Sequence, residues 1–221
     1  MLEPAAPTAD DALPPYQGLS LAEVRMVRTL DDAAAALAAM ACADAIGFDT
    51  ESKPTFRKGE VSTGPHLVQL ADDRHAWLFQ IASNADAAVD SAPVAVLRAL
   101  LASPTLLKVG FGLGDDLRRL RAKLGIDTVN VLDLATALRR GERNAWGAKT
   151  AVERFFGQRL QKSRRITTTN WAMPRLTDKQ ILYAADDAHV ALRIYRHWRA
   201  HVQNAPAPAS APAPARTKPQ D

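Results

Sequence analysis

The sequence predicts a single α/β domain whose mixed β-sheet is flanked by helices. Three hairpin-type strand segments come first, at residues 46–51, 66–71 and 75–81, and later strands alternate with helices. Hairpin strands favour antiparallel pairing, whereas strand–helix–strand units favour parallel pairing, so we expect one sheet with both kinds. The chain has 221 residues, 47% of them hydrophobic, which suits one domain with a substantial core.

The first half of the chain holds most of the predicted strands. Asp31 and Asp32 fall in the first turn of an Ala-rich segment, where acidic side chains favour a helix start. The short link at residues 72–74 makes a hairpin of the strands on either side. The elements expected here are strand 23–28, helix 30–42, strand 46–51, loop 52–65, strands 66–71 and 75–81, and helix 94–101.

The second half is predicted to be mainly helical. Thr177 offers a hydroxyl that can cap the start of a long helix reaching about residue 201. A basic, Thr-rich loop precedes it. The elements expected here are strand 106–111, helix 115–124, strand 128–132, helices 134–140 and 148–156, loop 161–169 and helix 178–201.

Both ends of the chain are rich in Pro and Ala. Residues 1–15 and 204–221 lack apolar periodicity, so we expect disordered tails there. The ordered domain is therefore expected to span residues 16–203.

Charge is distributed unevenly along the chain. Residues 1–104 carry 7 Lys and Arg against 14 Asp and Glu, whereas residues 105–203 carry 19 against 9. A basic half of this size is typical of a nucleic-acid-binding protein. Taken alone, it fits a solvated face of Arg-rich helices better.

Cysteine content and hydropathy indicate a cytoplasmic protein with no membrane association. Cys42 is the sole cysteine, which fits a reducing compartment, and its place in a helical segment predicts a buried side chain. No segment approaches the roughly 18 consecutive apolar residues of a membrane-spanning helix. The first residues include Glu3 and Asp10, unlike the basic start of a signal peptide.

Two pairs of side chains predict a carboxylate site. Asp49 and Glu51 are two residues apart on an apolar strand and therefore leave the same face. Tyr183 and Asp187 are four residues apart and share one face of a helix, where apolar neighbours make an unpaired acid costly. Alone, either pair also fits a structural role. Together they favour a site for a hard cation such as Mg²⁺, which prefers oxygen ligands.

A third acidic block follows a glycine-rich turn. The alternate glycines of residues 110–114 come after a strand, and Asp133 lies 21 residues after Gly112, nearly the layout of a dinucleotide-binding fingerprint. The last glycine position of that fingerprint is Asp115, however, and Asp115 and Asp116 would repel a pyrophosphate at this helix start. We therefore expect no nucleotide cofactor.

Together the three blocks resemble the DEDD superfamily of 3′→5′ exonucleases. The resemblance is to the branch with tyrosine in the third motif, which includes ribonuclease D and the Werner helicase exonuclease domain. The Asp-x-Glu motif matches Asp49 and Glu51, and Tyr-x-x-x-Asp matches Tyr183 and Asp187. In the second motif the best-aligned acid is Asp116.

The resemblance covers roughly residues 23–198, including His66-Leu67-Val68-Gln69-Leu70-Ala71 and the segment 170–177 before the third motif. Two assignments stay open by one residue, because Asp115 can replace Asp116 and Asp186 can replace Asp187.

What the resemblance implies is a ribonuclease H-like fold and a metal-dependent 3′→5′ exonuclease. Such an enzyme releases nucleoside 5′-monophosphates from single-stranded 3′ ends of DNA or RNA, with two divalent cations, Mg²⁺ or Mn²⁺. In that scheme Asp49 bridges both ions, Glu51 and Asp187 complete the first ion, and Asp116 holds the second. Tyr183 would orient the attacking water, since a phenol is a poor base at neutral pH.

Three basic residues before the third motif are candidates for contacts with the phosphate backbone, namely Lys162, Arg164 and Arg165. A merely solvated basic loop is the alternative. The sequence indicates no particular protein partner. A non-catalytic nucleic-acid-binding or scaffolding protein with an exonuclease-like fold is the rival function, but its mark would be a lost metal acid, and all four are present.

Overall fold

The structure, a computed structural model, describes residues 13–55, 57, 59–82, 91–139 and 144–203, without the side chains of residues 164, 202 and 203. Residues 1–12 and 204–221 of the predicted tails lie outside the described part. The amide of Arg159 donates to the carbonyl of Pro14 at 2.8 Å, and the amide of Tyr16 donates to the carbonyl of Arg159 at 2.9 Å. Residues 14–16 are therefore tied to the body of the domain.

Six strands form one mixed sheet in the order β1-β4-β3-β2-β5-β6. The strands β2, β3 and β4 are antiparallel neighbours, whereas β1 pairs in parallel with β4, β5 with β2, and β6 with β5. The prediction of a mixed α/β sheet is thus confirmed. The strand bounds are β1 Val24–Val27, β2 Ala45–Glu51, β3 Leu67–Ala71, β4 Ala76–Gln80, β5 Leu107–Gly110 and β6 Val131–Asp133.

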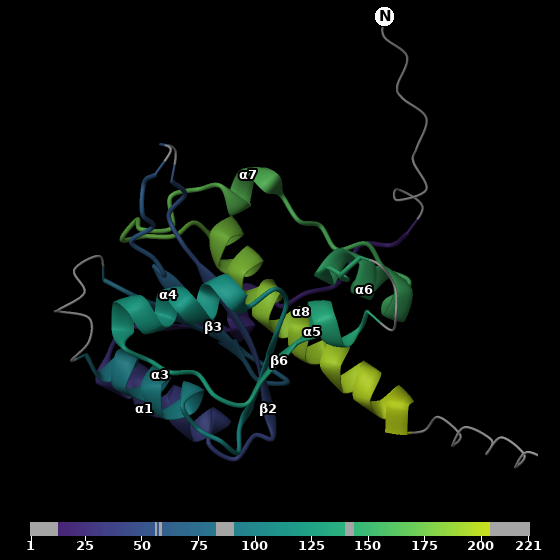
Figure 1. The fold of residues 1–221 in the computed structure, drawn as a ribbon, viewed down its shortest axis with the longest axis horizontal. Coiled ribbons are helices and arrows are strands. Elements are labelled where there is room, and N and C mark those ends of the chain that lie inside the picture. The colour runs from purple at the N-terminus through teal and green to yellow at the C-terminus, as the bar shows by residue number, and fades with distance from the viewer. Residues whose placement is uncertain (1–12, 56, 58, 83–90, 140–143, 204–221) are drawn as a thin grey trace, which may run out of the picture.

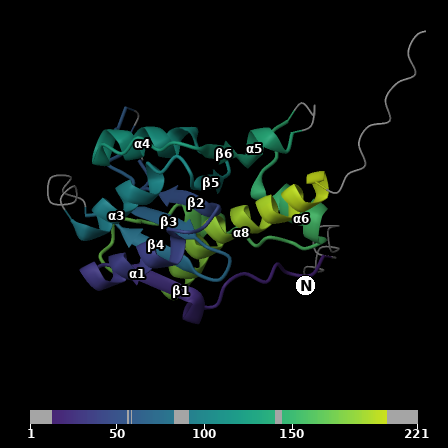
Figure 2. The same ribbon diagram turned by 90° about the horizontal axis from the view of Figure 1, so that it is seen from below.

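Helices cover both faces of the sheet (Figures 1 and 2). Helices α1, α3 and α4 lie on one face, and the long helix α8 crosses the other face beside α5 and α6. The helix bounds are α1 Leu30–Met40, α3 Ala92–Leu101, α4 Gly114–Leu124, α5 Leu134–Ala137, α6 Ala148–Phe156, α7 Arg164–Thr167 and α8 Asp178–Gln203, with a 3₁₀ turn at Leu21–Glu23. Within the described residues, no helix combines the length and the apolarity that crossing a membrane requires.

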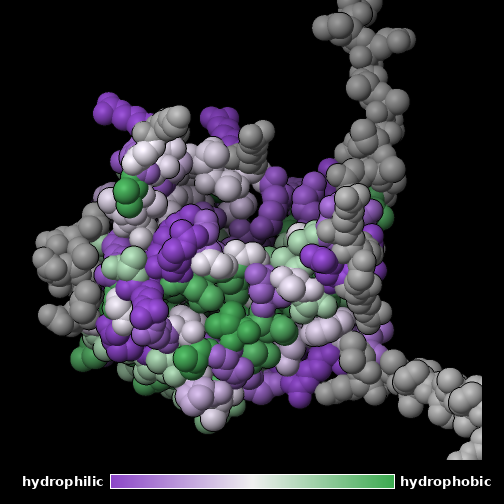
Figure 3. All heavy atoms as spheres, viewed as in Figure 1, coloured by the Kyte–Doolittle hydropathy of each residue, from purple (hydrophilic) through white to green (hydrophobic). Residues whose placement is uncertain are grey.

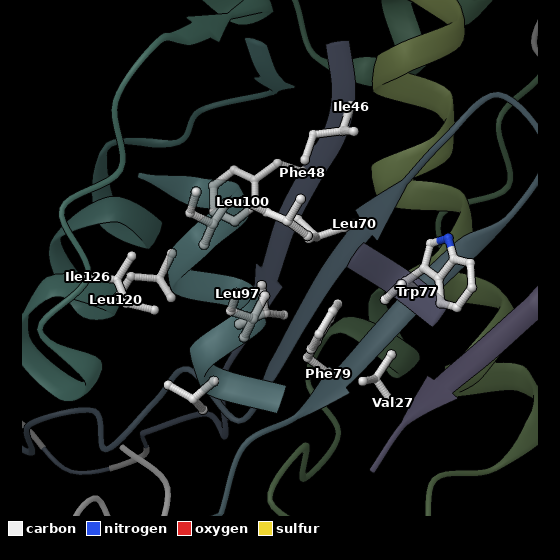
Figure 4. Packing of buried hydrophobic residues seen from close by; sticks show 14 of the residues in the cluster. Val27, Ile46, Phe48, Leu70, Trp77, Phe79, Leu97, Leu100, Leu120 and Ile126 are labelled. Atoms are coloured by element: carbon white, nitrogen blue, oxygen red, sulfur yellow. The ribbon is translucent and has the colours of Figure 1, made fainter. Parts of the chain in front are cut away.

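The larger core lies between the sheet and α1, α3 and α4 (Figure 4). Phe48 and Leu70 come from neighbouring central strands and pack with Leu97 and Leu100 of α3 and Leu120 of α4. A second cluster joins α8 to α5, α6 and β5. Both faces of β2 are covered, so almost all of its residues are buried. An acidic residue is unusual in such a strand.

Helix boundaries follow local side-chain chemistry. Thr29 caps α1, since its hydroxyl accepts from the Asp32 amide at 3.1 Å while the Asp32 carboxylate accepts from the Thr29 amide at 2.9 Å. The predicted cap at Thr177 is confirmed, because its hydroxyl accepts from the Gln180 amide at 3.4 Å. Cys42, by contrast, is exposed, because α1 ends at Met40 and leaves Cys42 in the following turn.

Several elements differ from the prediction, among them α5, which ends at Ala137, three residues before the end expected for that helix. The expected loop 161–169 contains the short helix α7, where the carbonyl of Ser163 accepts from the amides of Ile166 and Thr167 at 2.9 and 3.1 Å. Strand β6 begins three residues later than expected, because Asn130 has a φ of 52°, a left-handed conformation that interrupts an extended strand.

Gly47 lets α8 pack directly on β2. A Cβ at this position would lie 1.9 Å from the carbonyl oxygen of Ala188, so any side chain forces the helix away from the strand. We expect Gly47→Ala to lower the free energy of unfolding by about 1–3 kcal/mol, measured by urea denaturation. Gly114→Ala is the matched control, since a methyl group there would meet no atom within 4 Å, and stability should stay level or rise slightly. Equal stability of the two variants would contradict this close approach.

Candidate active site

Strand β2 carries two acids to its carboxyl end. Asp49 and Glu51 alternate with Phe48 and Thr50 and lie on the sheet face that α8 covers. Glu51 is only 9% exposed. Glu51 is therefore shielded from water, and Asp49 is partly buried beside the same helix.

Helix α8 supplies a third acid and the tyrosine. Asp187 is 8% exposed, and its carboxylate is hydrogen-bonded by the side chain of Tyr183, one turn earlier. The Tyr183 hydroxyl also lies 3.0 Å from Oγ1 of Thr167 in α7. Because Ala188 packs on Gly47, this part of α8 is held against β2.

The fourth acid comes from the start of α4. Asp116 accepts a short hydrogen bond from the hydroxyl of Thr50, which follows Asp49 in β2. Its side chain is 13% exposed, whereas that of the preceding Asp115 is 60% exposed and pairs with Arg118 and Arg119. Asp116 is thus the acid of this pair that faces β2.

Asp133 fixes the turn that leads into α4. Its carboxylate accepts from the amides of Gly112 at 2.9 Å, Leu113 at 3.1 Å and Ala135 at 2.9 Å. Gly112 has a φ of 68°, a conformation that favours glycine. The spacing that imitates a dinucleotide fingerprint therefore belongs to a loop closed by Asp133.

Asp186 points away from Asp187. Its carboxylate accepts from the amide of Leu19 at 2.8 Å, so it anchors the segment that leads into β1. Burial raises the pKa of Asp186 to about 6. Of the two neighbouring acids, Asp187 is the one that lies with Asp49 and Glu51.

Burial raises the pKa of all four carboxylates, and for Asp49 and Glu51 the neighbouring acids raise it further. Burial raises the pKa of Asp49 well above its ordinary value, and the nearby charges of Asp187 and Asp116 raise it further. Burial and then the charge of Asp49 raise the pKa of Glu51 to about 9. Burial also raises the pKa of Asp116 and of Asp187. Four acids in this state form a site that a cation would stabilise.

One cation of the protein itself already lies here. Lys162 Nζ is 2.7 Å from Asp187 Oδ1, and the lysine charge also lowers the pKa of Asp49 and of Glu51. Within the described residues, no three His, Cys, Asp or Glu side chains surround one point closely enough to hold a metal ion as they stand. The donor set is nevertheless all carboxylate oxygen, the chemistry that Mg²⁺ and Mn²⁺ prefer. These residues fit divalent ions once Lys162 withdraws from Asp187.

A family model described as a 3′-5′ exonuclease matches residues 24–203, nearly the whole described domain. The chain belongs to the 3′-5′ exonuclease family. Homologues of this domain are hydrolytic exonucleases, and the family generally uses divalent metal ions.

Curated relatives are similar over about two thirds of the chain. A 3′-5′ exonuclease of Arabidopsis thaliana is 29% identical over 154 residues, which is 68% of this chain and 51% of the relative. The mouse bifunctional 3′-5′ exonuclease/ATP-dependent helicase WRN is 28% identical over 155 residues, 69% of this chain and 11% of the relative. The chain therefore spans about half the length of the first relative and about a tenth of the second.

Solved structures share the fold. The Nibbler EXO domain of Aedes aegypti has a TM-score of 0.71 at 23% identity, covering 85% of this chain and 93% of that one. Escherichia coli RNase D has a TM-score of 0.64 at 25% identity, covering 82% and 46%. Trypanosoma brucei RNase D in complex with RNA U12 has a TM-score of 0.67 at 21% identity, covering 79% and 61%.

The three basic residues predicted to contact nucleic acid differ in their surroundings in this exonuclease domain. Lys162 is 34% exposed and pairs with Asp187, Arg165 is exposed on α7, and the side chain of Arg164 lies outside the described part. Hydrophilic side chains gather over α4 (Figure 3), where Arg118, Arg119 and Lys123 with residues 61–64 line a groove of about 490 Å³. A second groove of about 500 Å³ is lined by Lys149, Arg159, Leu160, Gln161, Lys162, Ser163 and Ile166.

Two contacts of the exonuclease site join residues that no local sequence pattern connects. The Thr50–Asp116 hydrogen bond joins residues 66 positions apart. The Lys162–Asp187 ion pair likewise depends on the path of the segment around α7.

Trp171 is a candidate from the sequence either for stacking on a base or for a core or hinge role. It is completely buried and donates to the carbonyl of Thr167 at 3.3 Å, so in this structure it belongs to the core.

Proposed function

We propose that this protein is a metal-dependent 3′→5′ exonuclease that hydrolyses single-stranded 3′ ends of DNA or RNA to nucleoside 5′-monophosphates. The observation that carries this proposal is the meeting of Asp49, Glu51, Asp116 and Asp187, from three distant segments, with Tyr183 hydrogen-bonded to Asp187. No acid of the family pattern is missing. A non-catalytic scaffold would have no need to maintain four buried or partly buried carboxylates beside one another.

The four carboxylates are the residues that would hold two divalent ions, Mg²⁺ or Mn²⁺. When bound, such ions lower the pKa of a water molecule and stabilise charge on the phosphate and the leaving oxygen. Asp49 lies between the acids of α8 and α4 and would hold ions together with them. Glu51 and Asp187 lie on the α8 side of it, and Asp116 lies on the α4 side.

Tyr183 would orient the attacking water without taking its proton. Burial and then the charge of Asp187 raise the pKa of the phenol above its ordinary value, so it stays protonated at neutral pH. A protonated phenol can donate one hydrogen bond and accept another. It can therefore hold a water molecule in line with a phosphorus atom.

Lys162 is suited to contact the phosphate after it leaves Asp187. An ammonium group beside the carboxylates compensates their charge, and a phosphodiester offers it a new anion at the same place. Arg164 and Arg165 follow on α7 and would extend this contact along the backbone of the nucleic acid. Arg119, which lines the α4 groove, lies 3.9 Å from Asp116 and would bring basic side chains of that groove close to the acids. Nucleic acid is the partner that this charge pattern favours.

Incubation of the purified protein with Mn²⁺ and end-labelled oligonucleotides tests the proposal. With 5′ label we expect a ladder that shortens one nucleotide at a time, and with 3′ label the immediate release of a labelled mononucleotide. Single-stranded DNA, duplex DNA and single-stranded RNA in parallel rank the substrates, and EDTA should abolish every product. Internal cleavage, or turnover that persists in EDTA, would exclude this function.

A further inference from the structure

Gln69 is a buried amide without a partner. It lies in the middle of β3 with 0% exposure, and neither its Nε2 nor its Oε1 has a hydrogen-bond partner within the described residues. An unsatisfied buried polar group costs about 1–3 kcal/mol relative to one that is hydrogen-bonded. A side chain retained at such a cost calls for a physical reason.

The sheet register places Gln69 directly opposite Asp49. Strands β2 and β3 are antiparallel, and these two residues are partners in the ladder. Directly opposed residues leave the same face, with Cβ atoms about 4.5–5.5 Å apart. The amide of Gln69 therefore lies on the α8 face, within one side-chain length of the Asp49 carboxylate.

The residues directly paired with Gln69, or next to it on this face of β3, are apolar except for Asp49. Leu78 is its partner in β4, and Leu67 and Ala71 are the next residues of β3 on the same face. The α8 residues that cover this part of the sheet are Ala184, Ala185 and Ala188. Among these direct neighbours Asp49 alone offers a side-chain acceptor, whereas Glu51 and Gln80 lie diagonally across the ladder.

One oxygen of Asp49 is already fixed. Its Oδ1 accepts from the amide of Thr50 at 2.9 Å. A second donor on the β3 side would fix the plane of the carboxylate, which decides where its lone pairs point. The register makes Nε2 of Gln69 the donor suited to that position.

We propose that Gln69 is a positioning residue, whose Nε2–H donates a hydrogen bond to the ionised carboxylate of Asp49 and holds it in the orientation that binds divalent ions. This role rests on the proposed metal site. Residues that orient metal ligands typically contribute 10–100-fold to metal affinity or activity.

Gln69→Met separates this role from a structural one. Methionine keeps the length and shape of glutamine without its polar atoms. The free energy of unfolding of the metal-free variant should therefore equal or exceed that of the wild type. Its affinity for Mn²⁺, measured by electron paramagnetic resonance of the free ion, should fall about 10–100-fold. Lower stability with unchanged Mn²⁺ affinity would overturn the proposal.

Gln180→Met is the matched control. Gln180 is also buried, but its Nε2 donates to Thr169 Oγ1 and its Oε1 accepts from the Thr177 amide, both at 3.0 Å. The same substitution there should lower the free energy of unfolding and leave the Mn²⁺ affinity within about threefold of wild type. Weakened Mn²⁺ binding in both variants alike would remove the special role of Gln69.

Two reference measurements distinguish failure of this role from failure of the metal site. Wild-type protein should bind Mn²⁺, and Asp49→Asn should not; absence of wild-type binding would defeat the proposed function and this inference together. Wild-type binding that needs Asp49 but not Gln69 would defeat this inference alone. Should Gln69→Met fail to fold, the side-chain amide resonance of Gln69 in wild-type protein should shift on Mg²⁺ addition, and an unmoved resonance would overturn the role.

Discussion

Asp49→Asn and Asp187→Asn are each expected to reduce exonuclease turnover at least about 1,000-fold without loss of the fold. A bound divalent ion contributes several kcal/mol of charge stabilisation in the transition state, and each 1.4 kcal/mol is worth about tenfold in rate. Asparagine keeps the size of the side chain but removes the charge that holds the ion. Single-turnover cleavage of a 5′-labelled oligonucleotide at saturating Mn²⁺ measures the rate, and circular dichroism checks the fold.

The neighbouring acids provide matched controls for this loss. Asp115→Asn should stay within about threefold of wild type, because Asp115 is exposed and pairs with Arg118 and Arg119. Asp186→Asn should also keep its activity, since an amide oxygen can still accept from the Leu19 amide. Asp116→Asn should lose activity with Asp49→Asn. If Asp115→Asn were the inactive variant instead, the second motif would be misassigned by one residue.

Local periodicity sufficed to group four of the five candidate site residues into two pairs. Asp49 and Glu51 share a face because side chains alternate along a strand, and Tyr183 and Asp187 lie together because a helix repeats every 3.6 residues. Neither period can choose between Asp115 and Asp116 at a helix start, where both are solvent-accessible until the helix is placed. Thr50, which contacts Asp116 from another strand, makes that choice.

The pairing of strands that lie far apart in the chain could not be predicted from the sequence either. Strand β1 lies at the sheet edge and pairs in parallel with β4, although α1, β2 and β3 separate the two strands in the chain. Nothing in residues 24–27 specifies that partner. The 21-residue spacing between Gly112 and Asp133 fits both a ribose-binding acid and an acid that closes a loop. The carboxylates at the helix start argue against ribose binding, and in the structure Asp133 closes the loop.

The metal-free protein is expected to lose stability as pH rises from 6.5 to 8. The folded pKa of Glu51 is about 9 against an ordinary 4.5, so in this window the folded protein keeps a proton that the unfolded chain has released. A folded state that binds more protons becomes less stable as pH rises. Asp49, with its pKa raised by burial and by Asp187 and Asp116, adds to the same slope.

Other groups set the limits of that window. Burial lowers the pKa of His66 to about 4, which makes stability rise with pH up to about 6.5 as the unfolded histidine loses its proton. Burial lowers the pKa of Lys108 to about 8, which has the same effect between about 8 and 10.5. Between these limits the carboxylates dominate. Each one that keeps its proton contributes a slope of up to about 1.4 kcal/mol per pH unit.

Urea unfolding in EDTA at pH 6.5, 7, 7.5 and 8 measures this slope, and Mn²⁺ should remove it. Divalent ions bind the ionised carboxylates of the folded state, so the gain in stability on adding Mn²⁺ should be larger at pH 8 than at pH 6.5. Glu51→Gln should flatten the metal-free slope, whereas Asp115→Asn, at an exposed position, should leave it unchanged. If the free energy of unfolding of the wild type in EDTA stays level or rises with pH, the four acids do not raise their pKa values by lying together, and the reason for placing cations among them is lost.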